Sequence, residues 1–103
     1  MTNEKTIVQR ITQLRLQKNV SARDMSLSIG QNQNYINNIE NGKTMPSMSA
    51  FLSICDYLGI TPSEFFDTHN AQPERLREAI KNLQKLDNER FNNITAVIAN
   101  LAN

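Results

Sequence analysis

Apolar residues recur every three to four positions along most of this chain, in short segments that end at glycine, proline or a capping residue. Runs of β-branched residues are short, and glycine and proline occur only three times each, which favours helix over strand. The pattern predicts helices at about 5–18, 21–30, 33–41, 47–58, 62–67, 73–86 and 88–102. We therefore expect an all-α fold.

Tight turns separate the first five predicted helices, and we expect these helices to form one domain over residues 1–67. Ser21 can cap the second helix, and Gly30 can end it. Asn32 can cap the third helix, and Gly42 can end it. The predicted buried side of the fourth helix contains Met48, Phe51, Leu52, Cys55 and Leu58.

The remaining residues are predicted to form a linker, 68–72, and a helical tail, 73–103, of two amphipathic helices. The tail helices are too short to bury their apolar faces alone. We therefore expect these faces to pack either on residues 1–67 or on a second copy of the chain. The candidate dimerisation residues are Leu76, Ile80, Leu83, Phe91, Ile94, Ile98 and Leu101.

The third predicted helix has two different faces. At about 100° per residue, one face carries the side-chain amides of Gln33, Asn34, Asn37 and Asn38. The opposite face carries Tyr35, Ile36 and Ile39 and can pack on a core. An amide presents a donor and an acceptor in one plane, which suits bidentate contact with adenine in the DNA major groove.

Charge does not by itself indicate nucleic-acid binding. The formal net charge is +1, and residues 1–69 carry six Lys or Arg and six Asp or Glu. Any DNA binding must therefore depend on local positive charge, and its salt dependence should be modest. The chain contains 14 Asn and 7 Gln, and a simple compositional bias is the alternative explanation for the amides outside residues 31–38.

Several function classes find no support in the sequence. The longest apolar run is 96–99, so we expect neither a signal peptide nor a membrane span. Cys55 is the single cysteine, which fits a reducing cytoplasm and a buried small side chain. His69 is the only histidine and has no suitably spaced partners for a metal, and no histidine lies near the serines at 21, 26 and 28 to activate them. We expect no enzymatic activity and no cofactor.

Residues 21–46 resemble the helix-turn-helix of the Cro/C1-type (XRE) regulators, a family of phage repressors and bacterial transcription factors. The resemblance covers about residues 7–67 and depends on a whole register rather than on one glycine. Its features are Ser21, Met25, Gly30, Ile36, the run Ile39-Glu40-Asn41-Gly42-Lys43, Pro46, Leu58-Gly59-Ile60 and Phe65-Phe66. It implies a five-helix lambda-repressor-like domain, and the tail resembles, more weakly, the helical dimerisation tails of some members.

The resemblance also implies roles for individual residues, with the third helix in the major groove of double-stranded DNA. The implied base readers are Gln33, Asn34, Tyr35 and Asn38. The implied DNA-backbone contacts are Lys18, Ser21, Arg23, Asn32, Asn37, Lys43 and Thr44. A solvated surface position is the alternative for Lys18, Arg23, Asn32 and Thr44, whereas Lys43 directly follows the third helix and is the stronger candidate. The family's ion pair between the first and third helices corresponds here to Arg15 with Glu40, which we interpret as part of the scaffold.

The chain departs from the family pattern in two places. Ala22 stands where the family often has a phosphate-contacting glutamine, so only backbone N–H groups remain at that position. Tyr35 is bulkier than the usual small residue, and it either reaches a thymine methyl or a phosphate or packs on the domain. The third helix carries no Arg or Lys, which predicts A·T pairs at the contacted positions.

Two hypotheses follow for the function. The first is a sequence-specific DNA-binding regulator, a repressor that binds an inverted-repeat operator as a homodimer. The second is a protein-interaction module with the same fold, such as an antitoxin or a regulator of another regulator. The low net charge and Ala22 favour the second slightly.

Overall fold

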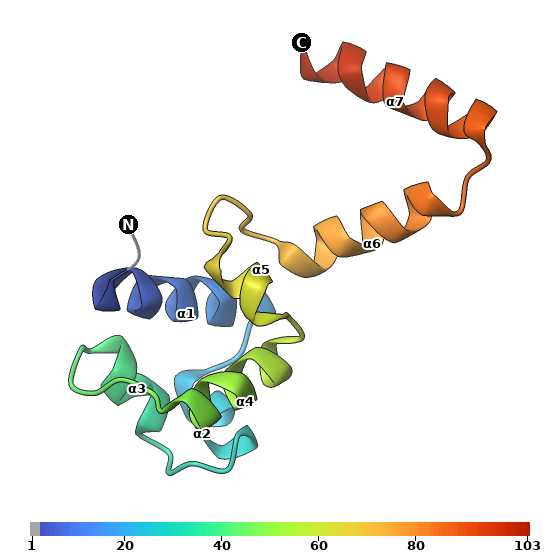
Figure 1. Cartoon of the computed structure of the whole chain (residues 1–103). Helices are drawn as coiled ribbons and strands as arrows, with labels where there is room; N and C mark the ends of the chain where they lie inside the picture. The colour runs from blue at the N-terminus through green and yellow to red at the C-terminus, as the bar shows by residue number, and fades with distance from the viewer. Residues whose placement is uncertain (1–2) are drawn as a thin grey trace. The chain divides into compact units, whose positions relative to one another are not determined.

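The computed structural model describes residues 3–103, and every regular element in that range is an α-helix. The helices are α1 (Glu4–Lys18), α2 (Ala22–Ser28), α3 (Tyr35–Glu40), α4 (Met48–Leu58), α5 (Pro62–Phe66), α6 (Pro73–Gln84) and α7 (Asn88–Ala102). The all-α prediction is therefore confirmed. The chain divides into two compact units, one up to Pro73 and one over Glu74–Asn103 (Figure 1).

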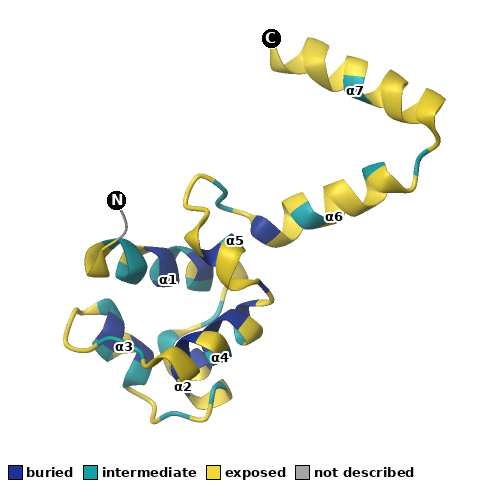
Figure 2. Ribbon diagram, in the orientation of Figure 1, coloured by how far each residue is buried: buried dark blue, intermediate teal, exposed yellow. Residues whose placement is uncertain are grey.

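The first unit gathers α1–α5 around one apolar core, whose residues are dark blue in Figure 2. Ile11 of α1, Ile36 and Ile39 of α3, Ile54 of α4 and Phe65 of α5 are fully buried. Burying each such side chain stabilises the fold by about 1.5–3 kcal/mol. Because α3 contributes two of these residues, its inner face is fixed on the core and its outer face is left to solvent.

A buried arginine ties α1 to the end of α5. Arg10 is only 3% exposed and donates to the backbone oxygens of Phe65 at 2.7 Å, Glu64 at 2.8 Å and Asp67 at 3.0 Å. These carbonyls lie at the C-terminal end of α5, where a helix does not supply every carbonyl with an N–H four residues ahead. Burial lowers the pKa of the Arg10 guanidinium, and the nearby Asp67 carboxylate opposes that shift. Sequence reasoning did not identify this contact, although Arg10 directly precedes Ile11 of the apolar stripe of α1.

The predicted start of the third helix is wrong by about two residues. The helix begins at Tyr35, not at 33, and its N-cap residue is Asn34, whose side chain makes no capping hydrogen bond. Instead, the Asn32 Oδ1 accepts from the Asn34 N–H at 2.9 Å, which forms a side-chain turn just before the helix. Gln33 and Asn34 therefore lie in this turn and not in the helix itself.

The predicted buried side of the fourth helix is wrong at two positions. Met48 is 72% exposed and Leu52 is 47% exposed. The buried stripe of α4 instead includes Ala50 and Ile54 beside Phe51, Cys55 and Leu58. Leu52 follows Phe51 by about 100° around the helix axis and so falls outside that stripe.

The second unit consists of most of α6 and all of α7, both amphipathic. Asp87 caps α7 by accepting from the Arg90 N–H at 2.8 Å, and no residue of α7 is buried. Seven large apolar side chains of these two helices are 40–82% exposed: Leu76, Ile80, Phe91, Ile94, Val97, Ile98 and Leu101. Over residues 3–103, none of the helices is both long and apolar enough to cross a bilayer.

Candidate nucleic-acid interface

The second and third helices form a helix-turn-helix with a defined start and a tight turn. Ser21 caps α2 by accepting from the Asp24 N–H at 3.0 Å. After α2, Gly30 adopts a left-handed conformation with φ +79°, and the Gln31 N–H donates to the Ser26 carbonyl at 2.9 Å. This arrangement is a Schellman motif, in which glycine avoids the steric cost that a side chain meets at positive φ.

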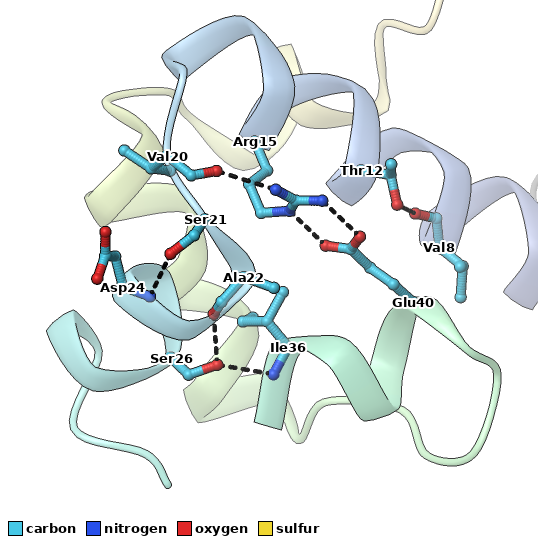
Figure 3. A network of polar contacts seen from close by, with 10 residues as sticks. All are labelled: Val8, Thr12, Arg15, Val20, Ser21, Ala22, Asp24, Ser26, Ile36 and Glu40. Carbon is cyan, nitrogen blue, oxygen red and sulfur yellow. Dashed lines mark hydrogen bonds and ion pairs between the residues drawn. The ribbon is translucent and has the colours of Figure 1, made fainter. Parts of the chain in front are cut away.

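A buried serine joins the two helices directly (Figure 3). The Ser26 side chain is fully buried, and its Oγ donates to the Ala22 carbonyl at 2.7 Å. The same Oγ accepts from the Ile36 N–H at 2.9 Å. That N–H belongs to the first turn of α3, where backbone donors have no partner within the helix. Ser26 therefore caps α3 from α2 and holds the start of the outer amide face in place.

An ion pair holds the other end of α3 (Figure 3). Arg15 of α1 donates from Nε to Glu40 Oε2 at 2.8 Å and from Nη2 to Glu40 Oε1 at 3.0 Å. A third bond runs from Arg15 Nη1 to the Val20 carbonyl at 2.9 Å. The hydrogen bonds to Glu40 raise the pKa of Arg15, although burial opposes this. Because Glu40 is paired with Arg15, its negative charge is compensated at the end of α3, whose outer face is open to solvent.

The chain leaves α3 through a second Schellman motif. Gly42 has φ +76°, its N–H donates to the Ile39 carbonyl, and the Lys43 N–H donates to the Asn38 carbonyl, both at 2.9 Å. Lys43 follows this turn and is exposed. The Lys43 side chain, which carries an ammonium group, therefore starts at the C-terminal end of α3.

The outer face of this unit is mainly neutral and hydrogen-bonding. Asn34 and Asn37 are exposed and Asn38 is partly exposed, and none of their side chains has a hydrogen-bond partner within residues 3–103. Tyr35, in contrast, is half-buried and packs against the core cluster, and burial raises the pKa of its phenol. Of the two roles that the sequence left open for Tyr35, packing is the one for which the structure supplies a contact.

The structure also joins two side chains for which the sequence suggested separate roles. Arg23 of α2 donates from Nη1 to the Oε1 of Gln33 at 2.6 Å, and both residues are exposed. A cation from α2 therefore lies directly beside the amide that precedes α3. Sequence reasoning had no signal for this pair, because the two residues are ten positions apart and lie on different elements.

The remaining candidate contacts are dispersed. Asn32 uses its Oδ1 in the turn before α3, which leaves its side-chain amide N–H groups as donors. Thr44 lies after α3, and its hydroxyl makes only a long contact of 3.5 Å to the Met45 carbonyl. Lys18 is at the end of α1, and its Nζ lies 5.5 Å from the ring centroid of Tyr57 on α4. The Lys18 ammonium group therefore lies over a side chain of α4.

The residues considered for other chemistry do not take part in this face. Cys55 is buried in α4, and burial together with the neighbouring Asp56 raises the pKa of its thiol to about 11. His69 is exposed in the segment between α5 and α6. In the part of the chain that the structure describes, no group of three His, Cys, Asp or Glu side chains is placed to hold a metal ion.

Comparison with known proteins agrees with this geometry. Residues 8–70 match a family model described as a helix-turn-helix domain. The matched range contains α2–α5, most of α1, and therefore the serine and ion-pair contacts that fix α3. No curated protein and no solved structure matches the chain.

Proposed function

The chain belongs to the Cro/C1-type (XRE) helix-turn-helix family, and from this premise we propose that it is a transcriptional repressor that binds a specific DNA sequence as a homodimer. In such domains the second helix of the motif lies in the major groove, and its N-terminal residues contact base edges. In this chain the corresponding residues lie in and just before α3.

The observation that carries the proposal is an open amide face on a helix that is fixed at both ends. Base recognition requires side chains held close to their productive geometry by the surrounding structure. Here Ser26 holds the start of α3 and the Arg15–Glu40 pair holds its end. Asn34 and Asn38 are left able to donate and accept together, which suits adenine and therefore A·T pairs.

The charge distribution predicts weak dependence on salt. Within residues 21–44 the cations are Arg23 and Lys43, and the anions are Asp24 and the paired Glu40. Each cationic phosphate contact contributes about −0.9 to the slope of log K against log salt concentration. A dimer with two to four such contacts therefore has a slope of about −2 to −4. Exposed neutral side chains such as Asn37 and Thr44 supply further phosphate contacts without that dependence.

We assign dimerisation to the tail. The apolar stripe of α7 runs through Phe91, Ile94, Ile98 and Leu101, all of them at least 40% exposed. Apolar faces of this kind mark an interaction surface. A two-fold dimer presents two copies of α3 to one side of the duplex, about 34–36 Å apart, which corresponds to an inverted repeat.

In vitro selection from random duplex DNA tests this function. We expect the purified chain to enrich an inverted repeat that contains A·T pairs. The triple variant Gln33→Ala, Asn34→Ala, Asn38→Ala should keep its circular dichroism spectrum and lose enrichment, whereas Gln17→Ala, an exposed amide on α1, should behave as wild type. Absence of enrichment at low salt would refute DNA reading and favour the protein-interaction module.

A further inference from the structure

The hydrogen bond between Arg23 and Gln33 changes which base the Gln33 amide can recognise. Bidentate reading of adenine requires Gln33 to accept from the base amino group through Oε1 and to donate to N7 through Nε2. In the structure, Oε1 already accepts from Arg23 Nη1 at 2.6 Å. An adenine amino group would therefore have to compete with the Arg23 guanidinium for this oxygen.

Arg23 and Gln33 together present mainly hydrogen-bond donors to the outside. Arg23 has five guanidinium N–H groups, and only the one bound to Gln33 has a partner among the described residues. No carboxylate of residues 3–103 forms an ion pair with Arg23, so its charge is uncompensated. Gln33 contributes the two N–H groups of Nε2. Guanine is the base whose major-groove edge consists of two acceptors, O6 and N7, and arginine contacts it more often than any other base.

We propose that Arg23 and Gln33 act as one composite reader that selects guanine at the position of each half-site that Gln33 faces. This inference rests on the proposed DNA-binding function. It differs from the expectation drawn from α3 alone, which has no cation and so predicts contacted positions rich in A·T pairs. The cation comes from α2, and the amide of Gln33 orients it toward the bases.

The test is selection of random duplex DNA by the full chain and by single variants. Gln33→Ala identifies the base position that Gln33 faces, because preference is lost at that position alone. We expect the wild type to prefer guanine there by about tenfold or more, as a good bidentate contact provides. Arg23→Ala should lose this preference and shift it toward adenine, because the freed Gln33 amide can then pair with adenine in both directions.

Two controls separate base reading from charge. Arg23→Lys keeps the positive charge but lacks the planar fork, so it should keep the salt slope and lose the guanine preference. Lys43→Ala, at an expected phosphate contact, should weaken binding to all sequences alike and reduce the salt slope by about one. Arg23 and Gln33 are both exposed, so the melting temperatures of their variants should match that of the wild type.

Each remaining outcome counts against the proposal in a recognisable way. If Arg23→Ala weakens all sequences equally and leaves the selected site unchanged, Arg23 is a phosphate contact and the composite reader is refuted. If the wild type selects adenine at the Gln33 position, the composite reader is refuted while the proposed function stands. If the wild type enriches no sequence, both fail together.

Discussion

Replacement of Ser26 by alanine removes both hydrogen bonds of its hydroxyl, and we expect it to destabilise the first unit mainly through the bond to the Ile36 N–H. Ser26 and Ile36 are both fully buried, and the Ser26 hydroxyl is the acceptor for the Ile36 N–H at 2.9 Å. Alanine removes that acceptor and fits the space without a clash. Because Ile36 lies at the start of α3, the helix offers its N–H no other acceptor.

The expected magnitude follows from leaving one donor unpaired. A buried backbone donor without a partner costs about 1–3 kcal/mol. Alanine is also the better helix former, by at most about 0.5 kcal/mol, which partly offsets the loss. We therefore expect Ser26→Ala to lower the free energy of unfolding by about 0.5–2.5 kcal/mol. In a domain of this size, each kcal/mol corresponds to about 4–8 °C in melting temperature.

Ser28→Ala is the matched control for this substitution. Ser28 ends the same helix and is exposed, and its side chain has no hydrogen-bond partner among the residues that the structure describes. Urea unfolding of both variants, followed by circular dichroism at one protein concentration, compares the same chemical change with and without the buried bond. If the two variants differ by less than about 0.5 kcal/mol, the assignment of Ser26 as the cap of α3 is wrong.

Three further predictions concern other parts of the chain. Glu40→Gln should lower the free energy of unfolding by about 1–3 kcal/mol, because it leaves the Arg15 guanidinium partly buried without its charged partner. In urea unfolding, the double variant with Arg15→Met should lose less stability than the sum of the losses in the two single variants. Cys55 should resist alkylation at pH 8 until the protein is unfolded, because a thiol with a pKa of about 11 is almost entirely protonated at that pH. In the unfolded chain the cysteine ionises near pH 8.5 and reacts. Rapid alkylation of the native protein would contradict the burial of Cys55. The pair Ile94→Asp, Ile98→Asp should give a monomer in analytical ultracentrifugation with the helix content of the first unit intact, and an unchanged dimer would place the interface elsewhere.

Most of the local structure was accessible from the sequence, because helix ends depend on neighbouring residues. Ser21, Thr61 and Asp87 each cap a helix by accepting from the N–H three residues later. Gly30 and Gly42 adopt positive φ at the turns that follow α2 and α3. These interactions span only a few residues, so the order of residue types along the chain predicts them.

The positions that the sequence analysis misjudged depend on packing direction. Met48 and Leu52 are apolar and were expected inside, but the face that α4 turns to the core is set by α1 and α5 and passes through Ile54. The start of α3 was likewise misplaced, because a turn stabilised by the Asn32 side chain competes with helix over residues 32–34.

By itself, the sequence determined the all-α fold and the outward amides of α3, because periodicity and capping act over one or two helical turns. The helix-turn-helix followed from the resemblance of residues 21–46 to the Cro/C1-type family. The resemblance also implied the Arg15–Glu40 pair, but only the tertiary structure revealed three other polar contacts across the fold. Arg10 reaches carbonyls 54–57 residues away, Ser26 caps a helix that is not its own, and Arg23 takes the acceptor of Gln33. Such bonds form only once the core has brought distant segments together, so no local pattern encodes them.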